Sequence, residues 1–267
     1  MQAHAVASLP VGRIGHFNEA WLTWVALTLS VIGGFVDAVG YLALFRLFTA
    51  HMSGNTAAAG ADLARLEWST ALRSLIPIAT FLLGVCLGAA IKQEGSRRGL
   101  RSWFAVSCGL ECLLLTTLMT FGQGPADDGL LEQNSRAYVV LATLPCLAMG
   151  IQSASFQRVG SVGVRTTFIT GILTGLGEEL VSSVYAGRHE REPAGGAEVS
   201  LSAPNQATLE RALLFGGLWL AYLVGGLLAG VGLLLWRLGA LILPVVALAG
   251  LAILDVVRPL QPSVSRA

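Results

Sequence analysis

Long apolar stretches constrain the fold of this chain more than any other feature of its sequence. A helix that crosses the hydrocarbon core of a bilayer needs about 20 mostly apolar residues. Six stretches meet this length: Leu22 to Leu47, Leu72 to Ile91, Trp103 to Phe121, Tyr138 to Phe156, Leu213 to Trp236 and Leu238 to Val257. Only 12% of the residues are charged, whereas soluble domains carry about 25%. We therefore predict an all-α, polytopic transmembrane helix bundle that lies in a lipid bilayer.

The composition also argues against several functional classes. A net charge of +1 provides no concentrated basic face, so we expect no nucleic-acid partner. Four cysteines lie in apolar stretches without metal-type spacing to histidine, and we expect no metal and no cofactor. The sequence has no phosphate-binding glycine loop followed by Lys-Ser/Thr, and no local signature of a catalytic triad. An ATP-driven pump is disfavoured, and we assign no catalytic residues.

The distribution of Lys and Arg predicts the orientation in the membrane, because cytoplasmic loops carry an excess of both. Basic residues gather after the second and the fourth stretch, whereas the loop after the third stretch is acidic. Both termini are therefore predicted to be cytoplasmic, with segments 1–21 and 258–267 outside the membrane. A polar insertion over 187–207, rich in Gly and Pro, predicts a flexible cytoplasmic loop.

The second half of the chain repeats motifs of the first half. Residues 34–38, 49–54 and 81–84 match 150–154, 166–171 and 222–225 in the same order. Each repeat, about 22–122 and about 138–257, would hold three spans, and an odd number inverts the second copy. We thus predict a 3+3 inverted repeat, an arrangement that places the substrate site of many secondary transporters where the two halves meet. Segments 52–63 and 168–180 are the candidate interrupted or re-entrant pieces.

Two of these motifs carry a resemblance to a known family. Gly34 to Ala38, followed after about a dozen residues by Ser53-Gly54-Asn55-Thr56, resembles the YoaK-type family of bacterial membrane proteins. The resemblance covers roughly residues 22 to 257. It implies a multi-pass, permease-like protein of the bacterial cytoplasmic (inner) membrane, in a family without an established substrate.

Asp37 and Glu111 are the two acids most clearly inside the predicted spans. A charged side chain at membrane depth costs on the order of 2.5 to 3.5 kcal/mol, so both should face the interior of the bundle. Each is a candidate proton or cation site. The alternative is that each acid only forms hydrogen bonds across a helix contact.

Further polar residues complete the candidate site. His51 and Asn55 are four residues apart and share one face if their segment is helical; alternatively, Gly54 and Asn55 form only a helix-ending turn. The polar candidates of the second half, Gln152, Ser153 and Thr170, are uncharged. The full set of candidate solute- or ion-binding residues is Asp37, His51, Asn55, Glu111, Gln152, Ser153 and Thr170, and the associated motif residues are Gly34, Phe35, Gly54, Thr56 and Gly171.

These features favour a small secondary permease for an unknown solute or ion, with proton coupling through the buried acids. A membrane-embedded enzyme or a lipid-binding protein that uses the same acids is the alternative. A structural partner of another membrane protein is a third hypothesis. Assembly into a homo-oligomer remains open.

Overall fold

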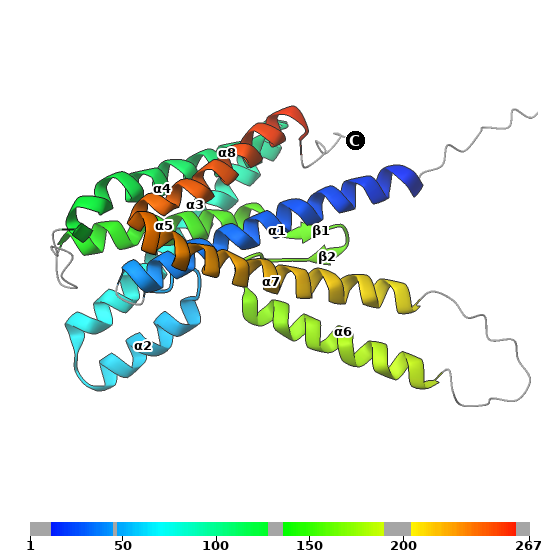
Figure 1. Ribbon diagram of the computed structural model, residues 1–267, viewed down its shortest axis with the longest axis horizontal. Coiled ribbons are helices and arrows are strands. Elements are labelled where there is room, and N and C mark those ends of the chain that lie inside the picture. The colour runs from blue at the N-terminus through cyan, green and yellow to red at the C-terminus, as the bar shows by residue number, and fades with distance from the viewer. Residues whose placement is uncertain (1–11, 45–46, 128–135, 190–203, 260–267) are drawn as a thin grey trace, which may run out of the picture.

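Helices form nearly the whole of the described chain, which comprises residues 12–44, 47–127, 136–189 and 204–259 of a computed structural model. The elements form one elongated bundle (Figure 1). In chain order they are α1 Gly12–Ala43, α2 Met52–Ala64, α3 Trp68–Arg97, α4 Trp103–Asp127, α5 Arg136–Ser155, β1 Arg158–Val159, β2 Val162–Gly163, α6 Ile169–His189, α7 Pro204–Trp236, the 3₁₀ helix η1 Arg237–Leu241, and α8 Ile242–Val257.

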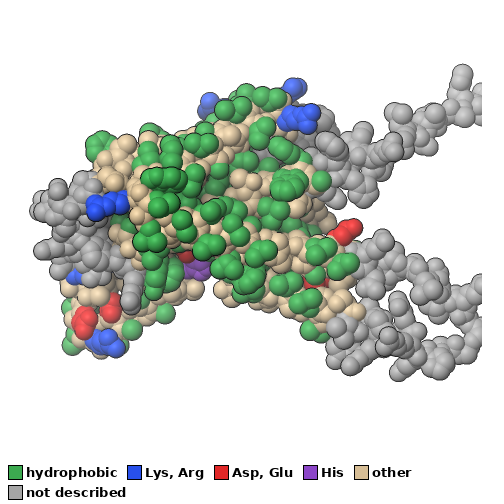
Figure 2. Space-filling view, viewed as in Figure 1, with side chains coloured by type: hydrophobic (Ala, Val, Ile, Leu, Met, Phe, Trp, Pro, Cys, Tyr) green, Lys and Arg blue, Asp and Glu red, His purple; other side chains and the backbone are tan. Residues whose placement is uncertain are grey.

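The described helices are long and apolar enough for a membrane protein. Four stretches of the described residues could each cross a bilayer: Ala20–Ala43, Trp68–Arg97, Trp103–Gln123 and Ala207–Val257. The last of these has 51 residues and contains α7, η1 and α8, while the apolar part of α5, Val139–Ser155, is shorter. Hydrophobic side chains also cover much of the outer surface (Figure 2). The prediction of an all-helical transmembrane bundle is confirmed.

The structure shifts several of the predicted boundaries. Helix α1 begins at Gly12, inside the predicted N-terminal segment, and ends at Ala43 rather than at Leu47. Segments 52–63 and 168–180 are helical, as α2 and the first part of α6. Helices α6 and α7 occupy both ends of the predicted 187–207 loop. Its remainder, 190–203, lies outside the described residues, as do 1–11 and 260–267.

The helices pack in pairs that are distant in the sequence. Helix α1 lies along α7, and α3 lies along α5; α4 packs between α5 and α8. Helices α2 and α6 attach to these pairs, α2 on α3 and α6 on α7. Figure 1 shows α2 and α6 on the same side of the bundle.

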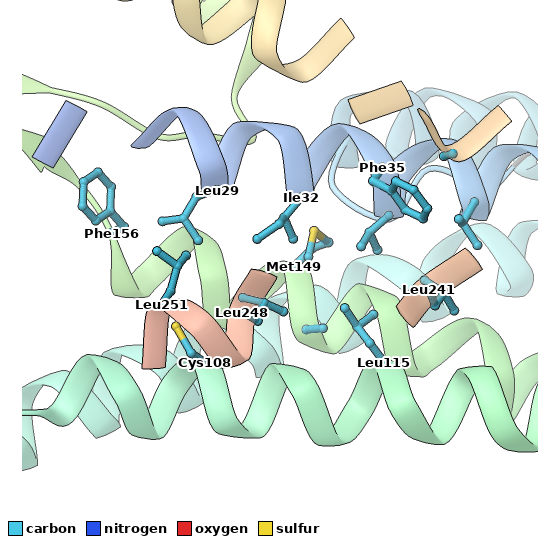
Figure 3. Close-up of a cluster of buried hydrophobic side chains, with 14 of the residues drawn as sticks. Leu29, Ile32, Phe35, Cys108, Leu115, Met149, Phe156, Leu241, Leu248 and Leu251 are labelled. Atoms are coloured by element: carbon cyan, nitrogen blue, oxygen red, sulfur yellow. The ribbon is translucent and has the colours of Figure 1, made fainter. Parts of the chain in front are cut away.

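A hydrophobic core fills the centre of the bundle (Figure 3). Helix α1 contributes Leu29 and Ile32, which point toward residues of α4, α5 and α8 such as Leu115, Met149 and Leu248, and the buried Phe35, whose ring lies near Gly232 of α7. In a bilayer the surrounding lipid is as apolar as these side chains, so close packing rather than exclusion from water holds such helices together.

Glycines permit the closest helix contact, between α1 and α7. A Cβ atom added to Gly34 would overlap the carbonyl oxygen of Tyr222, and one added to Gly225 would overlap the carbonyl oxygen of Val31. The two backbones therefore touch at this crossing, which no larger residue at either glycine would allow without a shift.

The same contact recurs between α3 and α5. A Cβ atom on Gly84 would overlap the carbonyl oxygen of Leu147, and one on Gly150 would overlap that of Phe81. In the alignment of the two halves Gly84 corresponds to Gly225, and Gly150 corresponds to Gly34. The two backbone contacts thus involve equivalent residues.

Candidate functional site

The carboxylate of Asp37 lies at the first break in the bundle, where α1 ends and the chain turns toward α2. One of its oxygens, Oδ1, accepts hydrogen bonds from the backbone N–H of Thr49 at 2.6 Å and of Ala50 at 2.9 Å. The Thr49 hydroxyl donates to the same oxygen at 3.0 Å. Asp37 is 5% exposed. Asp37 therefore holds the connection between α1 and α2 against the last turns of α1 through these hydrogen bonds.

The second oxygen, Oδ2, joins this connection to α7. His51 Nδ1 lies 2.6 Å from Oδ2, and the hydroxyl of Tyr222 donates to Oδ2 at 2.9 Å. An ionised carboxylate only accepts hydrogen bonds, so with Asp37 ionised the proton of this contact is on Nδ1 of His51. The remaining ring nitrogen, Nε2, is then the atom with which His51 can meet a solute.

The second break, between α5 and α6, is held by neutral groups instead. Ser153 stands where the repeat places Asp37, and its hydroxyl is 2.8 Å from that of Thr167. Gln152 donates to the carbonyl oxygen of Leu29 at 2.9 Å, and Ser30 donates to that of Thr166 at 3.0 Å. The connection before α6 is thereby bound to α1.

A cavity of about 320 Å³ lies where the two breaks meet. Its wall includes His51 and Ser53 from the first break and Ser153, Thr167 and Thr170 from the second. Apolar side chains of α3 complete the wall. In Figure 2 the histidine surface, purple, lies in the recess between the two lower lobes of the molecule. The volume of the cavity is in the range of small-molecule sites.

An open cleft of about 450 Å³ adjoins this cavity. Gln157, Arg165 and Phe168 line both the cavity and the cleft. Arg158 lines the cleft but not the cavity. Lys92 of α3 donates a hydrogen bond of 3.2 Å to Gln157. Arg158 and Arg165 therefore place positive charge in the cleft beside the cavity, and Lys92 lies next to it.

The structure brings three of the predicted site residues, His51, Ser153 and Thr170, to the cavity wall. Asp37 and Gln152 stand one layer behind it, Asp37 against His51 and Gln152 beside Ser153. The predicted role of Asp37 is thus changed in one respect, since His51 rather than the carboxylate meets the cavity.

Asn55 and Gly54 belong to the start of helix α2 and do not line the cavity. Asn55 lies in the first turns of α2 and donates to the carbonyl oxygen of Phe48 at 2.9 Å. Gly54 and Asn55 thus begin a helix, and the alternative of a helix-ending turn is wrong. His51 precedes that helix as its N-cap residue, so the shared helical face does not exist.

Other motif residues are also placed by the packing. Phe35 is buried in the core, and Gly34 is in the α1–α7 contact. Thr56 donates to the Met52 carbonyl oxygen at 2.7 Å on an exposed face. Gly171 lies against the ring of Phe168, where a Cβ would overlap that ring.

Glu111 is separate from the cavity. It is 1% exposed within α4, and its Oε2 atom has no hydrogen-bond partner. Ser107, one turn earlier on the same face, is also fully buried with an unpartnered hydroxyl. The two predicted acids therefore have different surroundings: Asp37 accepts several hydrogen bonds, whereas Glu111 is buried within α4 with one oxygen unpartnered.

Tyr222 and Arg165 are among the residues of the site that sequence reasoning missed. Tyr222 could have been found from the repeat, since it replaces Phe81 of the first half at the position facing Asp37. Arg165 belongs to the basic stretch after the fourth apolar segment, and its place at the cavity depends on how this connection folds back. Among the described residues, no three His, Cys, Asp or Glu side chains lie close enough together to bind a metal ion.

The fold and the surface define a polytopic helical membrane protein with a small cavity at the junction of its two broken segments. Residues 25–254 match the family model described as "Protein of unknown function (DUF1275)", and the chain belongs to this family. It is 26% identical over 160 residues to the UPF0700 transmembrane protein YoaK of Bacillus subtilis (strain 168). That match covers 59% of this chain and 66% of the relative, just under two thirds of its length. The resemblance to the YoaK-type family is thereby confirmed. No solved structure matches the chain.

Proposed function

We propose that this protein is a secondary permease of the bacterial cytoplasmic membrane, with its solute site in the cavity between the two breaks. The observation that carries the proposal is the position of this cavity. It is bounded by residues next to both helix interruptions, and in many transporters such interruptions supply the polar groups of a midplane site. Irregular backbone at membrane depth is tolerated where it lines a cavity.

The proposal includes six spans arranged as a 3+3 inverted repeat. The six helices would be α1, α3, α4, α5, α7 and α8, with α2 and α6 as the re-entrant pieces. Equivalent glycine contacts at Gly34–Gly225 and Gly150–Gly84 support the repeat. Asp37 and Ser153, aligned in the two halves, both bind the chain segment that precedes the next short helix.

Proton coupling would use the Asp37–His51 pair. His51 is joined to the buried carboxylate through Nδ1 and has a side chain 30% exposed. A proton taken up at Nε2 would give an imidazolium ion stabilised by Asp37, and its loss would restore the neutral ring. Asp37 therefore acts as a positioning residue for the group that meets the solute.

The topology part of the proposal predicts opposite sides for the two ends of α4. In a variant without the native cysteines, Asp127→Cys should react with a membrane-impermeant maleimide in intact cells. Arg97→Cys should react only after permeabilisation, because its loop is basic and expected in the cytoplasm. Labelling of both positions from the same side would contradict the six-span arrangement.

The transport part predicts that filling the cavity stops solute movement. Thr170→Trp places a large ring at the cavity wall on a residue that is exposed and makes no core contact. Thr174→Trp, one turn further along α6 and away from the cavity, is the matched control. Proteoliposomes would be incubated with a defined mixture of carboxylates, amino acids, sugars and nucleosides, and their contents measured by mass spectrometry.

We expect at least one solute to accumulate with the unaltered protein and with Thr174→Trp but not with Thr170→Trp. The loss should be at least tenfold, since the ring occupies the path. Equal uptake by both variants would remove this cavity from the transport path. Contents no different from those of protein-free liposomes would contradict the permease proposal for these solutes.

A further inference from the structure

The lining of the central cavity carries positive charge and no negative charge among its described residues. Arg165 is its permanent cation, and His51 presents an imidazole edge. The nearest acid, Asp37, stands behind His51, and its carboxylate already accepts five hydrogen bonds. The electrostatic environment of a solute would therefore be set by Arg165 rather than by Asp37.

The adjoining cleft has the same charge. Its described lining contains Arg158 and Arg165 and no acid. Lys92, bonded to Gln157 at the boundary of the two spaces, adds a third cation nearby. A solute that enters through this cleft would meet only cations, which raises the local concentration of anions and lowers that of cations.

The cavity wall also contains small hydrogen-bonding groups suited to an anion. The hydroxyls of Ser153, Thr167 and Thr170 can each donate. The first turns of α2 and α6 reach the cavity through Met52, Ser53 and Thr170. Both helices thus begin at the cavity, and the positive end of a helix dipole favours an anion.

Most of the remaining wall is apolar. Phe81 and Val85 of α3, Ala154 of α5, Met52 and Phe168 all contribute to it. A sugar or another polyhydroxylated solute would leave hydroxyl groups against these side chains without partners, which is unfavourable. An apolar body with one polar end matches the wall better.

We infer that the cavity binds a small organic carboxylate: its anionic end meets Arg165 and the hydroxyls, and also His51 when Nε2 carries a proton, and its apolar body lies against Phe81, Val85 and Phe168. This inference rests on the proposed permease function for its biological meaning, and it specifies the class of solute. Arg165 is suited to the task because a guanidinium can donate two parallel hydrogen bonds to one carboxylate.

The inference is tested by equilibrium binding to the full-length protein in detergent, measured by calorimetry. Three probes share the same ring and differ in the polar end: benzoate, benzyl alcohol and benzylamine. Benzoate should bind at least tenfold more tightly than benzyl alcohol, and benzylamine should bind more weakly than either. These differences follow from the fixed positive charge at one end of the cavity.

The variants separate the role of Arg165 from general effects. Arg165→Gln should weaken benzoate binding about ten- to one-hundredfold, as for loss of a charged hydrogen bond, and leave benzyl alcohol unchanged. Arg165→Lys keeps the charge without the paired donors and should lie in between. Arg101→Gln removes an exposed charge that does not line the cavity, and should have no effect. Thermal unfolding of each variant checks that it is folded.

Equal affinity for the three probes, tighter binding of benzylamine, absence of benzoate binding, or unchanged benzoate binding by folded Arg165→Gln would each overturn the inference. The outcome for the permease proposal is separate. Benzoate binding without uptake of any solute by proteoliposomes would contradict transport but keep the carboxylate site. Uptake of a neutral or cationic solute that Thr170→Trp blocks, without benzoate binding, would support transport and contradict the carboxylate site.

Discussion

Replacing Gly225 by alanine should destabilise the protein strongly, although the new side chain is a single methyl group. The added Cβ would overlap the carbonyl oxygen of Val31, which belongs to the backbone of α1 and cannot rotate away. Overpacking of this kind costs about 1–3 kcal/mol. Alanine favours a helix over glycine by about 1 kcal/mol, so the net loss is smaller than the cost of the overlap, and the difference from a Gly→Ala change at an open position on the same helix measures the contact.

The matched control is Gly230→Ala on the same helix. A Cβ at Gly230 would meet nothing within 4 Å, so only the gain in helix propensity remains, and stability should be unchanged or slightly higher. Thermal unfolding in one detergent, followed by size-exclusion chromatography after heating, gives the comparison. Similar transition temperatures for Gly225→Ala and Gly230→Ala would show that α1 and α7 are not in backbone contact.

Replacing Asp37 should have the second large effect on stability. Two substitutions, to Ala and to Asn, separate the loss of its hydrogen bonds from the loss of its charge. Asp37→Ala leaves the buried N–H groups of Thr49 and Ala50 and the side chains of His51 and Tyr222 without their acceptor. Removing one partner of a buried charged network costs about 3–5 kcal/mol. We expect a large fall in the unfolding temperature and loss of the fixed connection between α1 and α2.

Asp37→Asn retains one carbonyl oxygen, which can still accept from Thr49 and Ala50, but it removes the charge beside His51. The protein should therefore unfold at a temperature well above that of Asp37→Ala. If His51 carries the coupled proton, Asp37→Asn should lose uptake driven by a pH gradient while still exchanging solute at equal pH. Unchanged gradient-driven uptake by folded Asp37→Asn would mean that the pair only stabilises the structure.

Tyr222→Phe provides a control for this network. It removes one donor to Asp37 and keeps the ring, and it restores the residue that the first half has at the equivalent position, Phe81. The expected cost is about 1 kcal/mol, the net worth of one hydrogen bond. The effect of Asp37→Ala should be clearly larger.

The long apolar stretches predicted the helices because length and hydrophobicity are properties of each segment alone. The pairing of α1 with α7 and of α3 with α5 could not be derived in that way. It depends on which glycine faces which carbonyl group, and glycines such as Gly230 and Gly225 are indistinguishable in the sequence. Only the alignment of the two halves indicated that Gly84 and Gly225 have equivalent positions.

The site was predictable where a residue conflicts with its surroundings. An acid within an apolar helix, such as Asp37, is expected to have hydrogen-bond partners. Most of them come from residues 49–51, in the segment where the sequence predicted a break. Arg165 showed no such conflict, because an arginine in a polar loop needs no explanation. Its position depends on the fold of the connection between α5 and α6, which no local pattern determines.

The pairing of α1 with α7 has a consequence for biogenesis. A ribosome makes α1 early and α7 late, so the glycine face at Gly34 has no partner during the synthesis of α2 to α6. Over that interval the nascent α1 must be covered by lipid, by α5 and its neighbours, or by the insertion machinery. The backbone contact between α1 and α7 can therefore form only after α7 has been made.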